Sequence, residues 1–132
     1  MREASRRITP PAHLCRDPEV GLRASAAVFY VVRRYVAVPE RLAAFHDFFN
    51  GYLLPIQVRH GARLVGRWET DDQEVIAVWE YDDRAAYERI DAAVRADPAS
   101  IEAQERRDTL GPLFTEKHGT FARSTVQRAG SE

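Results

Sequence analysis

The hydrophobic pattern changes its period within residues 59–87, and this change limits the folds that the chain can adopt. The stretch reads RHGARLVGRWETDDQEVIAVWEYDDRAAY. Gly61 stands where the end of a helix needs a residue that tolerates positive φ, and after it the apolar residues alternate instead of following a helical repeat. Residues 70–73 are turn formers between two alternating runs. The stretch therefore predicts the end of a helix, a β-hairpin and the start of a second helix.

The first strand of this hairpin is predicted to have one clearly apolar face, because residues 62–69 alternate. The apolar face carries Leu64, Gly66 and Trp68. The opposite face carries Arg63, Val65, Arg67 and Glu69. The second strand, residues 75–81, is rich in β-branched and aromatic residues, with Trp79 and Tyr81 on one side.

Residues 26–38, AAVFYVVRRYVAV, are typical of a strand that precedes the hairpin. Both faces of this strand are largely apolar, although Arg33 falls on one and Arg34 on the other. A strand of this kind is covered on both sides. One layer of helices covers one face of the sheet, so we expect a second copy of the chain to cover the other.

A long helix is predicted from Pro39 to about residue 59, because proline suits the first helical position. Its apolar stripe consists of Leu42, Phe45, Phe49, Leu53 and Ile56, widened by Phe48 and Tyr52. Pro55 lacks a backbone N–H and crowds the preceding turn. We therefore expect a kink or break near Leu54.

Two further helices and a last strand complete the pattern. The Asp-Asp pair at residues 82–83 supplies an N-cap for one helix, and Asp97-Pro98 begins another that reaches about residue 108. Residues 116–128 alternate well enough for a final strand. The order is that of the ferredoxin-like α+β fold, βαββαβ, with a four-stranded antiparallel sheet and helices on one face. Two such sheets packed face to face form a dimeric α/β barrel.

Length and composition narrow the class of protein. At 132 residues the chain suits a single domain. We expect a flexible N-terminal extension at residues 1–25, a domain at residues 26–128 and a tail at residues 129–132. The formal net charge of −1 provides no overall positive field for nucleic acid or an acidic membrane. The single cysteine, Cys15, excludes an internal disulfide and favours a reducing compartment, so we expect the cytoplasm.

Several motifs in order resemble the NIPSNAP family over about residues 31–98. They are the Arg-x-Tyr of Arg33 and Tyr35, the spaced aromatics Phe45 and Phe49, the His60-Gly61 to Gly66-x-Trp68 segment, and Trp79-x-Tyr81. The resemblance implies a dimeric ferredoxin-like fold, similar to that of cofactor-independent monooxygenases and haem-degrading enzymes. Val31 stands where the family often carries an acidic residue, so a role of that acid is not expected here.

Candidate site residues are one histidine and a set of aromatic and basic side chains. The four histidines, at positions 13, 46, 60 and 118, have no histidine or cysteine at metal-ligand spacing, so no metal is expected. His46, at the edge of the apolar stripe, is the candidate base, with a half-exposed boundary histidine as the alternative. The candidate ligand-binding residues are Arg33, Arg34, Tyr35, Phe49, Trp68, Trp79 and Tyr81. Packing in the core or in a dimer interface is the alternative for the aromatic residues.

The sequence thus predicts a homodimer that binds a small apolar or aromatic molecule between sheet and helices without a cofactor. If it is an enzyme, the resemblance suggests a cofactor-independent monooxygenase or isomerase. The alternative is a non-catalytic protein-interaction module of the same fold. A closed cavity reached by His46 and an arginine favours the first hypothesis, and a filled interior favours the second.

Overall fold

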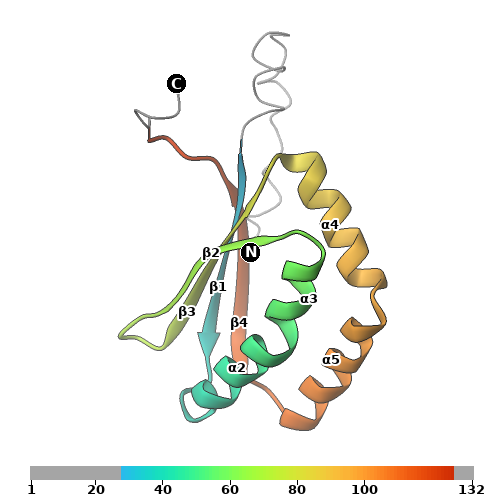
Figure 1. Cartoon of the computed structure of the whole chain (residues 1–132). Helices are drawn as coiled ribbons and strands as arrows, with labels where there is room; N and C mark the ends of the chain where they lie inside the picture. Colours follow the sequence, from blue (N-terminus) through green and yellow to red (C-terminus); the bar gives the residue numbers. More distant parts are fainter. Residues whose placement is uncertain (1–27, 127–132) are drawn as a thin grey trace, which may run out of the picture.

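The structure, a computed structural model, describes residues 28–126 (Figure 1). The strands are β1 (Phe29–Ala37), β2 (Arg63–Glu69), β3 (Glu74–Tyr81) and β4 (Phe114–Ala122). The helical elements are the 3₁₀ turn η3 (Pro39–Arg41), α2 (Leu42–Phe48), the π-helical turn η4 (Phe49–Leu53), α3 (Leu54–Arg59), α4 (Arg84–Ala96) and α5 (Pro98–Leu110). The predicted extension with Cys15 and His13, the start of the first strand and the predicted tail lie outside the described residues.

The four strands form one antiparallel sheet in the order β2-β3-β1-β4, and the helices lie on one side of it (Figure 1). This arrangement confirms the predicted ferredoxin-like α+β fold. The sequence predicts the final strand at residues 116–128. In the structure it runs from Phe114 to Ala122, so it begins slightly earlier and is shorter. In the described part of the chain, no helix has the length and apolar character needed to cross a bilayer.

The first long helix accommodates Pro55 with a widened, π-helical turn. Phe48 and Leu54, on either side of η4, both keep right-handed helical backbone angles, so the chain does not leave the helical path. The N–H of Leu54 donates to the carbonyl of Phe49, five residues earlier, and Pro55 follows within the first turn of α3. At the kink or break predicted near Leu54 the structure therefore has a single π-helical turn inside a continuous helical path.

Aspartate caps begin the two later helices as predicted. The carboxylate of Asp83 accepts a hydrogen bond from the N–H of Ala86 at the start of α4. Asp97 accepts from the N–H of Ala99 at the start of α5 and also holds Arg59 and His60 at 2.7 and 2.8 Å. The second cap thereby ties the end of the first helical segment to the junction of α4 and α5.

The core fills the space between the sheet and the helices. One cluster of buried side chains consists of Val31, Phe49, Ala62, Trp79, Tyr81, Ala86 and Ile90. A second consists of Ala37, Phe45, Phe48, Ile56, Val75, Ala103 and Leu113. The inward sides of β1 and β3 supply residues to both clusters, as the alternation of the sequence predicts.

A β-bulge in β2 overturns the predicted faces of that strand. Leu64 lies opposite Trp79, whereas Gly66 lies opposite Val78, so Val65 is an extra residue without a partner of its own. Because Trp79 is buried under the helices, Leu64 faces the helices and Gly66 faces away from them. The prediction that these two residues share a face with Trp68 is wrong for Leu64.

The same bulge reverses the orientation of the next two side chains. Trp68 lies opposite Ile76 on the outer face of the sheet, with 51% of its surface exposed. Arg67 lies opposite the buried Ala77 and therefore points under the helices, contrary to its predicted position on a polar face. A pattern of alternating residues does not reveal an unpaired one, and the bulge shifts the phase by one residue.

Candidate functional site

A row of four residues across the inner face of the sheet places two arginines beside small side chains. Arg67 of β2, Ala77 of β3, Arg33 of β1 and Gly119 of β4 lie opposite one another in turn. A side chain at Gly119 would begin 3.6 Å from Nη1 of Arg33. Because Ala77 has a small side chain and Gly119 has none, these neighbouring strand positions cover little of the two guanidinium groups.

Arg67 is half-buried and has too few hydrogen-bond acceptors. Its guanidinium carbon lies 4.2 Å from the ring centre of Phe49 and 4.9 Å from that of Phe45. Its Nε and Nη2 atoms are buried without a hydrogen-bond partner. Burial lowers the pKa of Arg67, and the nearby Tyr35 opposes part of this effect. Stacking on two rings compensates a desolvated cation in part, but it does not satisfy its N–H groups.

His46 connects Arg67 to an acidic residue at the edge of the sheet. Nη1 of Arg67 lies 2.8 Å from Nδ1 of His46, and Nε2 of His46 lies 2.9 Å from Oε1 of Glu69. Arginine can only donate and the carboxylate can only accept, so the ring in this arrangement carries its proton on Nε2. Both ring nitrogens of the candidate base are therefore engaged, and His46 holds Arg67 in place.

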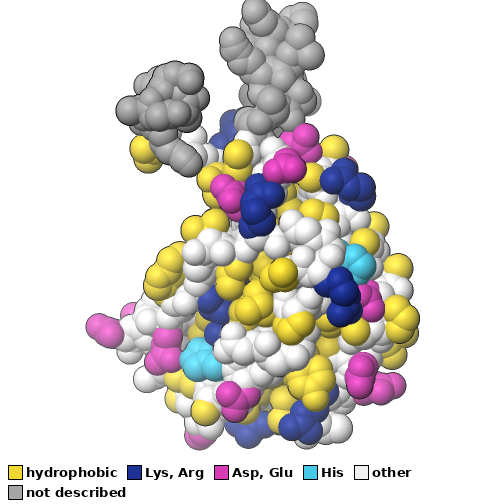
Figure 2. All heavy atoms as spheres, viewed as in Figure 1, with side chains coloured by type: hydrophobic (Ala, Val, Ile, Leu, Met, Phe, Trp, Pro, Cys, Tyr) yellow, Lys and Arg dark blue, Asp and Glu magenta, His cyan; other side chains and the backbone are white. Residues whose placement is uncertain are grey.

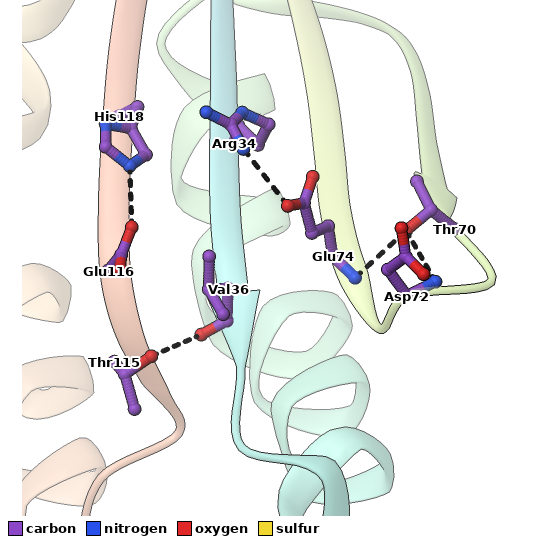
Figure 3. A network of polar contacts seen from close by, with 8 residues as sticks. All are labelled: Arg34, Val36, Thr70, Asp72, Glu74, Thr115, Glu116 and His118. Atoms are coloured by element: carbon purple, nitrogen blue, oxygen red, sulfur yellow. Dashed lines mark hydrogen bonds and ion pairs between the residues drawn. The ribbon is translucent and has the colours of Figure 1, made fainter.

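Arg33 and Arg34 are neighbours in sequence with opposite surroundings. Arg34 points to the outer face, where its Nη1 donates to Oε2 of Glu74 at 3.1 Å (Figure 3). Arg33 points inward and is half-buried, and it has no hydrogen bond or ion pair with any residue of the range 28–126. The sequence identified both arginines as needing a partner, and the outer one has found it within the chain.

Two further cations lie near Arg33. Lys117 of β4, the chain's only lysine, is directly opposite Tyr35, so it shares the inner face. The guanidinium carbon of Arg107 in α5 lies 5.0 Å from the ring centre of Phe114. Lys117 keeps solvent contact, yet desolvation of its ammonium group lowers its pKa, and the charges of Arg33, Arg107 and Arg95 lower it further.

The phenols of Tyr35 and Tyr81 lie close to these cations. Burial raises the pKa of Tyr35, and the charges of Arg33, Arg67 and Arg107 each oppose that rise. Burial also raises the pKa of Tyr81 to about 12, with Arg33 again opposing. Arginines from β1, β2 and α5 therefore all act on the single phenol of Tyr35.

Two carboxylates of this region are paired with other residues. Glu69 accepts from His46, and Asp91 pairs with Arg95 at 2.9 Å. Among the described residues no carboxylate forms an ion pair with Arg33, Arg67, Arg107 or Lys117, which we call the inner cations. Likewise, no group of three or more His, Cys, Asp or Glu side chains of that part of the chain could hold a metal ion.

Six of the eight predicted site residues lie on the helical side of the sheet or in its helices. They are Arg33, Tyr35, His46, Phe49, Trp79 and Tyr81. Arg34 and Trp68 lie on the outer face and are separated from the others by the sheet. Sequence reasoning missed Arg67, Lys117 and Arg107. The alternation of Lys117, Gly119 and Phe121 in β4 was the available signal for the second of these.

The outer face of the sheet carries apolar side chains with ion pairs among them. The apolar side chains are Val32, Val36, Ile76, Val78 and Trp68. Arg34 of the central strand β1 binds Glu74 of β3 among these residues, and His118 binds Glu116 on the edge strand β4 (Figure 3). On the opposite side of the molecule, hydrophobic side chains gather over the middle of the helical face with Lys and Arg side chains among them (Figure 2).

A shallow hollow of about 210 Å³ lies within the helical layer. It is lined by Gly51, Tyr52, Pro55, Ile56, Arg59, Ala99 and Glu102. Neither His46 nor any inner cation reaches it. This hollow is therefore not the cavity that would favour ligand binding next to His46.

Comparison with known proteins gives a family model and several similar structures. A model described as NIPSNAP matches residues 30–120. A NIPSNAP domain protein from Burkholderia xenovorans is 22% identical, with a TM-score of 0.64, covering 79% of this chain and 98% of that one. A NIPSNAP family protein from Agrobacterium tumefaciens is 18% identical, with a TM-score of 0.65, covering 75% and 89%.

One similar structure has a name that refers to chemistry. It is a candidate antibiotic biosynthesis monooxygenase from Bacteroides thetaiotaomicron, 15% identical, with a TM-score of 0.56 over 77% of this chain and 93% of that one. No curated protein matches the chain. At these identities the structural similarities show a common fold alone.

Proposed function

Because this chain belongs to the NIPSNAP family, we propose that it is a cytoplasmic homodimer that binds a small aromatic or apolar molecule between sheet and helices. The observation that carries the proposal is Arg67, a desolvated guanidinium with two buried nitrogen atoms that lack acceptors. Burying a donor without a partner costs about 1–3 kcal/mol. A ligand acceptor that enters from the Arg33 side recovers this cost.

The walls around the inner cations suit a flat or apolar ligand. Tyr35, Phe45 and Phe114 form a contiguous aromatic group, with ring centres 5.0 to 5.6 Å apart. Phe49 and Trp79 form another, at 6.1 Å, next to Arg67. Aromatic surface with a few polar groups is the usual lining of a small-molecule site.

The proposal of a dimer rests on the apolar residues of the outer face of the sheet. An exposed tryptophan lies there together with valine and isoleucine side chains, and the ion pair of Arg34 with Glu74 lies among them. Apolar area of this kind is commonly covered by a partner in a stable oligomer. A second copy is the occupant that the family's dimeric barrel provides.

For catalysis, the fold supports a cofactor-independent oxygenation or isomerisation with His46 as base only by analogy. In the geometry of this chain Nδ1 of His46 accepts from Arg67. A base role therefore requires Arg67 to leave Nδ1 for the ligand. Such an exchange would couple ligand binding to the availability of the base.

A non-catalytic interaction module is the second candidate function. Trp79 and Tyr81 are each only 4% exposed, which is the filled interior that this alternative predicts. The two candidates differ in whether a small molecule is retained by the folded protein.

Native mass spectrometry of protein purified from its own host tests both parts of the proposal. We expect a dimer that carries a reproducible additional mass, and we expect Arg67→Met to lose that mass. Arg63→Met, an exposed arginine of the same strand, is the matched control and should keep it. A dimer without added mass favours the interaction module, and a monomer overturns the dimeric barrel.

A further inference from the structure

We propose that the inner cations form a carboxylate-binding site, so that the ligand is an organic acid with an apolar body. This inference rests on the proposed function and specifies its ligand. Arg33, Lys117 and Arg107 are the primary contacts in this site, and the hydroxyl of Tyr35 is a further donor. Arg67 lies on the same face of the sheet, on the far side of Ala77 from Arg33.

The pairing of β1 with β4 places Arg33 and Lys117 together. Arg33 is opposite Gly119 and Tyr35 is opposite Lys117, so the two cations are diagonal neighbours on one face. Diagonal neighbours of an antiparallel pair lie about 7–8 Å apart at their Cα atoms, within reach of long side chains. The missing side chain at Gly119 lets the guanidinium of Arg33 extend toward β4.

Arg107 approaches the same place from the helical layer. Its guanidinium lies over the ring of Phe114, whose centre is 5.0 Å from that of Tyr35. Cations from β1, β4 and α5 thus converge around one phenol. The pKa effects of Arg33 and Arg107 on both Tyr35 and Lys117 agree with this geometry.

Like charges on one face repel, and no carboxylate of the described part of the chain forms an ion pair with these cations. Glu69 and Asp91 are bound instead to His46 and Arg95. Glu116 of β4 lies on the outer face, where it pairs with His118 (Figure 3). An anionic ligand removes this repulsion, and a carboxylate fits the planar fork of an arginine in two parallel hydrogen bonds.

The surroundings favour an organic acid over a polyanion. Arg33 and Arg107 are half-buried, Lys117 is exposed, and the chain as a whole has a net charge of −1. A nucleic acid or an anionic membrane requires a broad exposed basic surface. A molecule with one carboxylate on an aromatic or aliphatic body matches both the positive charge of this cluster and the aromatic side chains around it.

The test compares acids with uncharged molecules of the same shape. Binding of 1-naphthoate, 4-phenylbutyrate and decanoate, each beside its primary amide, is measured by isothermal titration calorimetry on the full chain. We expect at least one acid to bind about tenfold or more tightly than its amide, because the amide lacks the charge. Raising the salt concentration should weaken binding of the acid and leave binding of the amide unchanged.

Two pairs of variants locate the site. Arg33→Gln and Lys117→Gln should each weaken the acid about tenfold and leave amide binding unchanged. Arg34→Gln is the control for the first, because Arg34 is the next residue but lies on the outer face. Arg106→Gln is the control for the second. It removes one positive charge next to Arg107, but from an arginine that is exposed on α5.

The outcomes separate this inference from the proposed function. If acid and amide bind equally well, ligand binding stands and the carboxylate site is wrong. An acid preference that survives in both variants also overturns it. If none of the six compounds binds, both proposals fail. Folding is checked by thermal unfolding without ligand, in which Lys117→Gln should raise Tm because it relieves repulsion among the inner cations.

Discussion

The indole ring of Trp68 lies where a side chain at Gly66 would begin. A Cβ atom at Gly66 would lie 2.3 Å from Cζ2 of Trp68 and 2.4 Å from its Cη2. Both residues face away from the helices because the bulge at Val65 shifts the phase of β2. The Gly-x-Trp motif therefore has a packing reason, because glycine alone allows the ring to lie flat on the strand.

A double-mutant cycle tests this contact. Gly66→Ala should lower the free energy of unfolding by about 1–3 kcal/mol, because the ring must move off the strand. In a Trp68→Ala background the same change should stabilise the protein by about 0.5 kcal/mol, since alanine restricts the unfolded chain more than glycine. Chemical denaturation measures both effects. An equal effect of Gly66→Ala in the two backgrounds would contradict the packing explanation.

Replacing Arg67 by methionine should stabilise the ligand-free protein. Methionine keeps the contacts with Phe45 and Phe49 and removes the buried N–H groups that lack acceptors. We expect a gain of about 1 kcal/mol in urea denaturation. The control is Arg63→Met, which loses exposed ion pairs with Glu80 and Asp82 and should change stability little. A loss of stability in Arg67→Met would mean that stacking on the rings outweighs the unmet donors.

The tautomer of His46 follows from its partners. Arg67 donates to Nδ1 and Glu69 accepts from Nε2, so nitrogen NMR at neutral pH should show the proton on Nε2. In Arg67→Met the Nδ1 atom loses its donor, so its nitrogen resonance should shift, while Glu69 still accepts from Nε2 and keeps the proton there. A proton on Nδ1 in the wild-type protein would contradict the hydrogen-bond chain.

Alkaline pH should destabilise the fold through Tyr81. The pKa of this phenol is about 12 in the folded chain and 10.0 in the unfolded one. The unfolded state therefore loses its proton first, and stability falls as the pH rises from 10 toward 12, by about 2–3 kcal/mol in total. Tyr81→Phe should show a smaller decline in denaturation experiments across that range. Parallel declines of the two proteins would show that another group is responsible.

Ile76→Asp should convert the proposed dimer to a monomer. Ile76 lies on the outer face between Arg34 and Trp68, so an aspartate there places a charge in the middle of the proposed interface. Size-exclusion chromatography with light scattering measures the mass. Val58→Asp is the control, because Val58 is an exposed apolar residue of α3. A wild-type monomer, or an unchanged dimer in Ile76→Asp, would contradict an interface on this face.

The sequence by itself determined the order of elements, the fold and the family. Each depends on local chemistry, because hydrophobic period, aspartate caps and glycine or proline at helix ends act within a few residues. The sequence did not predict the pairing of His46 with Arg67 and Glu69, because the helix and the strand that carry these residues meet only through packing.

The tertiary structure decided which side chains face the interior. The bulge at Val65 arises from the register between β2 and β3, and it moved Arg67 inward and Trp68 outward against the alternating pattern. The convergence of Arg33, Lys117 and Arg107 likewise depends on the pairing of β1 with β4 and on the path of α5. A bulge or a strand pairing involves residues far apart in the chain, so no local pattern contains it.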